Sequence, residues 1–426
     1  MPTISRKTIG VLIIVALCAG CSSPALSQTI AQSGLARNIN PQTPAADVQT
    51  LTTDNLAFAW DLYHALRGTD SNLFFSPHSI STALAMTYAG ARGETAAEMT
   101  RVLHFTLPSE QLFPAFNALD LALQPGQPAE KEQPLELHGA NALWGQQGYT
   151  FRSEFLDLLA QNYGAGMRLV DFKTAAEAAR QAINQWVSEQ TQDRIKDPLA
   201  PGTIDALTRL VLVNAIYFKG GWLYPFEPKA THEGPFTRLD GSQVTVPLMF
   251  WSEAETVEYA RGEGYQIVEL PYQGGNAVMT ILLPDAGQFA AFEEKLTTAQ
   301  LQTLLSSLNP QMVKVALPRF RNENDFDLTQ VLGQLGMTTA LSEAADFSGM
   351  TGQRDLYIGA VIHKAFVEVN ESGTEAAAAT AVVMSVTSAP AEQPLEVKVD
   401  RPFIYLIRDT QTGAVLFVGR ALDPTQ

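Results

Sequence analysis

The sequence predicts a domain of the α+β class, because helical patterns come first along the chain and strand patterns come later. The first helix, within residues 56–66, is indicated by apolar residues at helical spacing: Leu56, Ala57, Ala59, Trp60, Leu62, Tyr63 and Leu66. Helical patterns recur at 79–89 and 175–190, and strand patterns follow at 210–218, 277–283, 312–317, 357–369, 403–407 and 414–418. Residues 409–413 contain the turn chemistry of a hairpin between the last two strands. Helices followed by mostly antiparallel strands are typical of α+β folds.

Composition indicates a globular chain with a large core. Of its 426 residues, 46% are hydrophobic and 17% are charged, and no Pro-rich or low-complexity linker divides the chain after its N-terminus. One domain is therefore the simplest interpretation, although the length would also permit two. The formal net charge of −16 argues against nucleic acid or another polyanion as a partner and predicts a solvated acidic surface.

The N-terminus has the pattern of an export signal. Arg6 and Lys7 precede an apolar stretch at 9–19, which is too short to span a bilayer comfortably, and Gly20 and Cys21 follow. Cys21 resembles the lipid acceptor of a bacterial lipoprotein, except that Cys18 stands where leucine is usual. Cleavage by an ordinary signal peptidase is the alternative.

We therefore expect a signal peptide at 1–20, a flexible tether at 21–50 and a globular domain at 51–426. The tether prediction rests on Ser, Gln, Pro, Ala and Asn with little hydrophobic periodicity between Ser22 and Val48. The expected location is outside the cytoplasm, either as a membrane-anchored lipoprotein facing the periplasm or exterior, or as a secreted protein. The lipid on Cys21 would be the only membrane attachment, and with Cys18 removed no disulfide could form.

The segment 363–384 is the most informative part of the chain, because a strand pattern runs into a series of very small side chains. As a strand, it would place Thr374, Ala376, Ala378 and Thr380 on one face, which could enter between two existing strands without a clash. Local rules alone favour a short helix instead, because alanine is the best helix former and Ser372 with Glu375 makes a capping-box pattern.

Short motifs spread along the chain occur together and in a fixed order. An early block runs from Asn72 to Met99, and the later motifs are NALW at 141–144, VDF at 170–172, LVNAIYFKGGW at 212–222, ELPY at 269–272, ILLP at 281–284, LPRF at 317–320, RPFIY at 401–405, LFVG at 416–419 and DPTQ at 423–426. From about Leu56 to Gln426 the chain resembles the serpins, a family of serine protease inhibitors. The resemblance implies three β-sheets, including a large central sheet A, surrounded by about eight or nine helices, with an exposed reactive loop.

The resemblance also implies a mechanism. A target serine protease would attack the exposed loop and form a covalent acyl complex, after which the loop would insert into sheet A and distort the protease. The hinge of the loop would comprise Glu371, Gly373, Thr374, Glu375, Ala376, Ala377, Ala378, Ala379 and Thr380. We expect a monomer whose partner is that protease.

The cleaved bond is expected near the middle of the loop. Counting from the hinge places it between Thr387 and Ser388, with the bond between Val386 and Thr387 as the alternative. No Arg or Lys lies between Glu371 and Lys398, so a trypsin-like target is disfavoured and elastase-like or subtilisin-like enzymes are expected.

Two further sets of residues match structural sites of the family. Ser76, Ser79, Asn214 and His363 match a hydrogen-bonded cluster beneath sheet A called the shutter. Trp222 matches a tryptophan at the top of that sheet, the breach, where the loop would first enter; ordinary core packing is an equally good interpretation of this residue.

An enzyme is not expected. The chain contains no G-x-S-x-G, H-E-x-x-H or G-x-x-x-x-G-K-[ST] motif and only six scattered histidines. We expect no cofactor and no metal. The alternative function is that of a noninhibitory serpin acting as a binding or chaperone protein. It is disfavoured because residues 373–381 lack the bulky, charged or proline residues that would block insertion, apart from Glu375, where the family tolerates glutamate.

Overall fold

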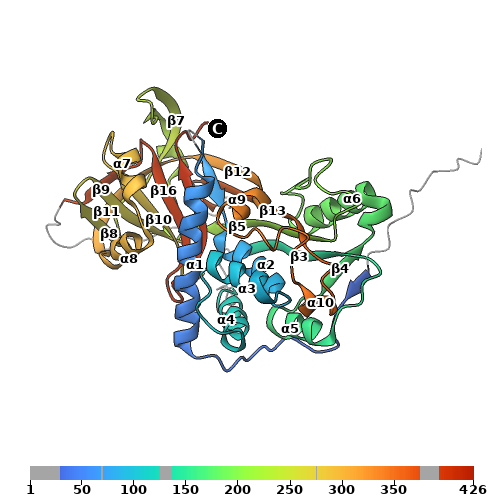
Figure 1. The fold of residues 1–426 in the computed structure, drawn as a ribbon. Helices are drawn as coiled ribbons and strands as arrows, with labels where there is room; N and C mark the ends of the chain where they lie inside the picture. The colour runs from blue at the N-terminus through green and yellow to red at the C-terminus, as the bar shows by residue number, and fades with distance from the viewer. Residues whose placement is uncertain (1–28, 69–70, 125–135, 275, 375–392) are drawn as a thin grey trace, which may run out of the picture.

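A computed structural model describes residues 29–68, 71–124, 136–274, 276–374 and 393–426. Its helices lie mostly in the first half of the chain and its strands mostly in the second, around two large sheets (Figure 1). The predicted α+β class is confirmed.

Sheet A has seven strands and contains the longest strands of the described chain. In spatial order they are β1 (Thr29–Ala31), β4 (Met167–Val170), β3 (Glu136–Gln146), β5 (Leu210–Gly221), β14 (Gly373–Thr374), β13 (Ile358–Asn370) and β12 (Phe320–Asp327). Strands β3 and β5 run antiparallel, whereas β5 and β13 pair in parallel below β14. The centre of the sheet is therefore a parallel pair with a short third strand at one end.

The remaining described strands form one continuous network of ten. Its main path is β2 (Leu73–Phe75), β17 (Val415–Ala421), β16 (Phe403–Asp409), β10 (Ala277–Pro284), β9 (Tyr265–Pro271), β8 (Glu255–Gly262), β11 (Asn309–Pro318), β7 (Gln243–Phe250) and β6 (His232–Thr237), and β15 (Leu395–Lys398) pairs with β11. Strand β11 pairs with β8 through its first half and with β7 through its second. Hydrogen bonding through β11 thus joins two of the three expected sheets.

The described residues form ten α-helices, against the eight or nine expected, and the shortest of them is a single turn. They are α1 (Ala45–Leu66), α2 (Pro77–Tyr88), α3 (Gly93–Val102), α4 (Ser109–Ala122), α5 (Ser153–Tyr163), α6 (Phe172–Gln190), α7 (Phe289–Lys295), α8 (Thr298–Ser306), α9 (Leu328–Gln334) and α10 (Ser348–Thr351), with a 3₁₀ turn η1 at Pro228–Ala230. Among the described residues, none of these helices has both the length and the apolar composition needed to cross a membrane.

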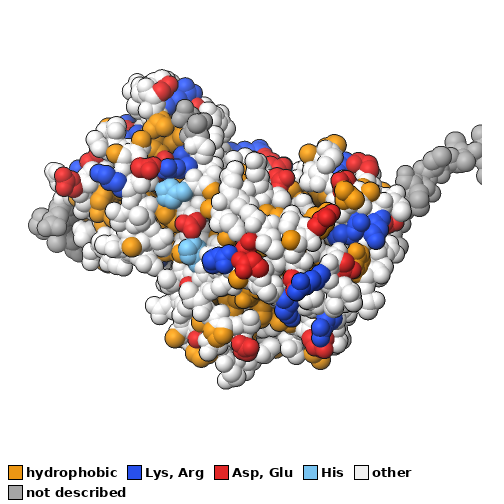
Figure 2. All heavy atoms as spheres, in the orientation of Figure 1, with side chains coloured by type: hydrophobic (Ala, Val, Ile, Leu, Met, Phe, Trp, Pro, Cys, Tyr) orange, Lys and Arg blue, Asp and Glu red, His pale blue; other side chains and the backbone are white. Residues whose placement is uncertain are grey.

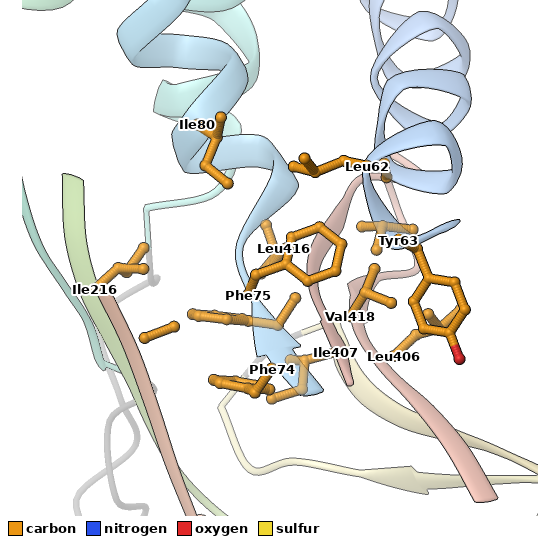
Figure 3. Close-up of a cluster of buried hydrophobic side chains, with 14 of the residues drawn as sticks. Leu62, Tyr63, Phe74, Phe75, Ile80, Ile216, Leu406, Ile407, Leu416 and Val418 are labelled. Atoms are coloured by element: carbon orange, nitrogen blue, oxygen red, sulfur yellow. The ribbon is translucent and has the colours of Figure 1, made fainter. Parts of the chain in front are cut away.

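The central strands of sheet A are buried on both faces because their side chains alternate between two cores. On one face, Trp144 of β3 and Val213 of β5 pack with Trp186 of α6. On the other face, Leu212 and Ile216 join the main core, which continues into β2, β16, β17 and the helices α1 and α2 (Figure 3). Strands β5 and β13 therefore lie in the middle of the molecule, between the two cores.

Aromatic side chains hold the main core together beneath sheet A. Phe74 of β2 stacks on Phe417 of β17 with ring centroids 5.0 Å apart, and it also packs on Tyr405. On the face shown in Figure 2, acidic and basic side chains lie beside one another at the surface.

The N-terminal segment differs from the sequence expectation. From Thr29 onward the predicted flexible tether is wrong: β1 pairs with β4 at the edge of sheet A, and α1 already begins at Ala45. Low hydrophobicity does not prevent this packing, because an open sheet edge offers backbone partners to any extended segment. The expected signal peptide, Cys21 and the rest of the tether up to residue 28 lie outside the described residues.

Candidate functional site

The candidate site is the end of sheet A where β14 lies between β5 and β13. Thr374 pairs with Gly220 on one side and with Val369 on the other, and Gly373 pairs with Gly221 and Asn370. A side chain at Gly373 would not fit, because an added Cβ would lie 2.1 Å from the carbonyl oxygen of Gly220. Gly373 and Thr374 of the predicted hinge are therefore a strand of sheet A, and they do not form the helix that local rules favour.

Thr374 is completely buried. Its hydroxyl lies 2.8 Å from the hydroxyl of Tyr272, which is itself buried and belongs to the turn after β9. The small side chain thus fits within the sheet, as predicted for this face of the hinge. The remaining hinge residues, Glu375, Ala376, Ala377, Ala378, Ala379 and Thr380, and the candidate bond residues Val386, Thr387 and Ser388 lie outside the described residues.

Below β14 the sheet is closed. Strands β5 and β13 pair directly in eight registers, from Leu210 opposite Ile358 to Tyr217 opposite Phe366. Only beyond Tyr217 do the two strands diverge far enough to admit β14. More of the loop can enter only if these direct pairs separate.

The four predicted shutter residues meet in one hydrogen-bonded cluster beneath the closed part of the sheet. His363 Nδ1 lies 2.5 Å from Asn214 Oδ1, and the Asn214 amide donates to the hydroxyl of Ser79. The backbone N–H of Ser76 donates to His363 Nε2 at 3.1 Å, and Ser76 Oγ accepts from the backbone N–H of Ser79. The cluster joins β13, β5 and the start of α2.

The protonation state of His363 follows from its partners. Because the N–H of Ser76 can only donate, Nε2 must accept and Nδ1 must carry the proton that is donated to Asn214. The ring has no exposed surface, and burial lowers the pKa of His363 to about 3. The imidazole is thus neutral at physiological pH, and its bond to Asn214 crosses the interface between β5 and β13.

Trp222 contacts the hinge at the top of the sheet. Its backbone N–H donates to the carbonyl of Ser372 at 2.9 Å, and its indole N–H donates to the carbonyl of Asn370 at 3.0 Å. The ring stacks on Tyr272 with a centroid distance of 4.5 Å and is buried. Trp222 is therefore a buried core side chain that also contacts Asn370 and Ser372, the residues that lead into β14.

Glu371 fixes the turn that leads into β14. Its carboxylate pairs with the guanidinium of Arg319 and accepts a 2.7 Å hydrogen bond from Thr231. Burial alone would raise the pKa of Glu371, but the hydrogen bonds from Arg319 and Thr231 lower it below its usual value. The hinge thus starts from a charged, anchored residue.

Three contact residues were not predicted from the sequence as part of the site: Tyr272, Arg319 and Thr231. Tyr272 and Arg319 lie in the ELPY and LPRF motifs, so a signal existed, but nothing in those motifs reveals a contact with residues 52 or more positions away. In the described parts of the chain, no group of three or more His, Cys, Asp and Glu side chains is placed to hold a metal ion.

Comparison with known proteins identifies the family. The family model described as "Serpin (serine protease inhibitor)" matches residues 53–424. The chain belongs to the serpin family. Serpins are protease inhibitors rather than enzymes, so the expectation that the chain is not an enzyme is confirmed.

Relatives of this serpin come from distant organisms. It is 40% identical over 386 residues to the leukocyte elastase inhibitor of Bos taurus, covering 88% of this chain and 100% of that one. It is 42% identical over 370 residues to an uncharacterised serpin-like protein of Thermococcus kodakarensis, covering 86% and 84% of the two chains.

Solved structures agree with the fold of this serpin. Serpin48 of the insect Tenebrio molitor aligns with a TM-score of 0.77 at 33% identity, covering 88% of this chain and 98% of that one. Uncleaved ovalbumin aligns with a TM-score of 0.76 at 29% identity, covering 88% and 100%.

Proposed function

We propose that this serpin inhibits serine proteases as a suicide substrate. The serine hydroxyl of the protease attacks the carbonyl carbon of Thr387, and the peptide bond to Ser388 breaks as the new amino group takes a proton from the protease. The cut loop then inserts into sheet A, as serpins are known to do, and carries the acylated protease with it. Distortion of the protease keeps water from hydrolysing the ester.

The observation that carries the proposal is the position of β14. Gly373 and Thr374 already occupy the place of a central strand, paired on both sides, at the end of the sheet where an inserting loop would begin. The following residues as far as Ala379 are glutamate and alanines, and Thr374 shows that a small side chain at this level is completely buried. Insertion would therefore extend a strand that has already started.

The closed sheet below β14 sets the energy of insertion. A new central strand breaks the direct pairing of β5 with β13 and replaces it with two ladders, so the net gain is about one ladder. For an insert on the order of ten residues at about 1 kcal/mol per hydrogen bond, the gain is on the order of 10 kcal/mol. The uncut loop is held at both ends by β14 and β15, so without cleavage this energy is released only slowly.

The shutter cluster would act as the latch of this transition. The hydrogen bond from His363 to Asn214 joins the two strands that must part. Because the cluster is buried and each of its hydrogen bonds has a defined donor, it stabilises the closed sheet. If β5 and β13 separated, Asn214 and His363 would each need a new hydrogen-bond partner.

Targets of the elastase-like or subtilisin-like kind are supported by the loop sequence. The residues between Glu371 and Lys398 include no Arg or Lys, and Val386 and Thr387 suit small apolar specificity pockets. The relatives named leukocyte elastase inhibitors, at about 40% identity, point in the same direction.

The test is to mix the purified protein with elastase, subtilisin and trypsin at equal molar ratios. Inhibition predicts an adduct that survives boiling in detergent with elastase or subtilisin, together with a released peptide whose N-terminus is Ser388. A peptide beginning at Thr387 would support the alternative bond. Complete cleavage without an adduct for every protease would refute the proposal.

A noninhibitory role is the second candidate, because ovalbumin and thyroxine-binding globulin also share this fold. That role requires no insertion, so the protein would be cut as a plain substrate. The partial insertion at Gly373 and Thr374 and the alanine series favour inhibition.

We also propose that residues 1–20 direct export and that Cys21 carries a lipid. Residues 21–28 would then connect the domain to the membrane, because the chain from Thr29 onward packs on the domain. Fractionation of cells expressing the wild type and Cys21→Ala tests this proposal. Release of the variant alone into the soluble fraction is expected, and equal distribution would contradict lipidation.

A further inference from the structure

We propose that residues 29–44, here called the N-terminal strap, resist the opening of sheet A and so slow spontaneous insertion of the uncut loop. The inference rests on the proposed function, because it concerns the same sheet and the same loop. Figure 1 shows the strap running from the edge of the sheet at β4, beneath α5 and α4, to the start of α1.

One end of the strap is attached to the β5 side of the sheet. Residues Thr29, Ile30 and Ala31 pair antiparallel with Leu169, Arg168 and Met167 of β4. Further along, Ser33 donates to Asp157 of α5 at 2.5 Å, and the backbone N–H of Asn38 donates to the carbonyl of Gln161 at 2.9 Å. Strand β4 is bound through β3 to β5, so the pairing of β1 with β4 attaches the strap to one half of sheet A. The contacts of Ser33 and Asn38 add attachments to α5, which connects β3 to β4 in the chain.

The other end of the strap is attached to α4. Arg37 pairs with Asp120 at 2.6 Å and donates to the side-chain oxygen of Asn117 at 2.8 Å. The Asn117 amide donates to the carbonyl of Asn38 at 2.7 Å, and the Asn117 side chain is completely buried. The strap thus supplies the shorter of the two hydrogen bonds that this amide donates; the other, to the carbonyl of Gln161, is 3.5 Å long.

The two attachments lie on parts of the molecule that insertion must shift relative to each other. Widening the gap between β5 and β13 by one strand spacing, about 4.8 Å, displaces β5, β3 and β4 from the rest. Helix α4 packs on α5 and also on α1, and α1 in turn packs on α2 and β17 in the main core and follows the strap directly in the chain. The strap therefore bridges the displaced half-sheet and the core, and its contacts must break or stretch when the sheet opens.

Gly166 provides a specific way to loosen the strap. A Cβ added there would lie 2.8 Å from the carbonyl oxygen of Ala31, 2.9 Å from Gln32 Cβ and 3.1 Å from Ile30 Cγ2. All three atoms belong to the strap, so Gly166→Ala is expected to push β1 from the sheet edge. Gly34→Ala is the matched control, because an added Cβ at Gly34, within the strap, meets nothing within 4 Å.

The experiment uses the full chain without any protease. Wild type, Gly166→Ala, Arg37→Ala and Gly34→Ala are incubated at 37 °C, and the fraction converted to a more heat-stable, uncut form is followed by melting curves and intact mass. Gly166→Ala and Arg37→Ala are expected to convert at least about tenfold faster than the wild type, and Gly34→Ala at the wild-type rate.

Conversion of both strap variants at the wild-type rate would overturn the inference. If Gly166→Ala fails to fold, Arg37→Ala decides the test, because the Arg37 side chain is only partly buried and pairs with a half-exposed carboxylate. Adduct formation by fresh wild type with elastase is scored separately. Its absence would count against the proposed function, whereas the conversion rates test the strap alone.

Discussion

Substitution of Thr374 by arginine tests whether a small side chain at this position is needed for insertion. Thr374 is fully buried between β5 and β13, with its hydroxyl on Tyr272. An arginine there must either bury its guanidinium without an acidic partner or keep the hinge out of the sheet. We expect the second outcome, because burying an unpaired charge costs several kcal/mol.

The structure gives the size of the effect. At this level β14 makes four residue pairs, two with β13 and two with β5, and the hydrogen bonds they carry are worth about 1 kcal/mol each. The cost of burying the unpaired guanidinium is therefore as large as the hydrogen-bond energy gained in the first step of insertion. A barrier raised by about 4 kcal/mol slows insertion by about a thousandfold. The acyl complex would then be hydrolysed before the protease is distorted.

The assay compares adduct with cleaved inhibitor on a denaturing gel after reaction with elastase. The wild type is expected to give mostly adduct and Thr374→Arg almost only cleaved protein. Ser372→Arg is the matched control, because it introduces the same charge two residues earlier at a partly exposed side chain and is expected to retain adduct formation. If Thr374→Arg forms the adduct with wild-type yield, the reasoning about the buried hinge is refuted.

Three further changes probe the latch, the anchor and the reactive bond. Because burial lowers the pKa of His363 to about 3 from 6.5, the folded state binds fewer protons, and stability is lost as the pH falls below about 6.5. Between pH 7 and 5 the free energy of unfolding in urea should fall by about 2 kcal/mol more in the wild type than in His363→Gln, and equal slopes would contradict this. Glu371→Gln removes the ion pair with Arg319, whose side chain is half exposed. The free energy of unfolding is therefore expected to fall by about 1 kcal/mol and the melting temperature by about 1–2 °C. An unchanged melting curve would show that the pair contributes nothing to stability. Thr387→Arg should yield a trypsin adduct and a released peptide beginning at Ser388, whereas trypsin cleavage without an adduct would place the bond elsewhere.

The sequence predicted the main elements well because their patterns are local. The predicted strand at 357–369 is β13 at Ile358–Asn370, and the predicted helix at 175–190 lies within α6. At the hinge, local and family patterns disagreed, and the described part follows the family. The reason is nonlocal: Gly220 and Gly221, about 150 residues earlier, present free backbone groups to Gly373 and Thr374.

Contacts between distant residues could not be predicted in the same way. The residue types of the shutter came from the family resemblance, but the proton on Nδ1 of His363 is set by the N–H of Ser76, which only the fold brings near. The N-terminal strap was missed because its composition is that of a linker. Gly166 leaves room for the strap and Asn117 donates a hydrogen bond to it, and the local sequence around these two residues does not predict either contact.

The account depends on energy that is released when the cut loop enters sheet A, and a melting comparison measures this directly. The loop is nicked by a protease present in trace amounts, and the melting curves of nicked and intact protein are recorded side by side. An insertion worth on the order of 10 kcal/mol predicts a rise in melting temperature of at least about 10 °C. Equal melting temperatures for both forms, with the nick verified by mass, would contradict insertion and with it the proposed inhibition.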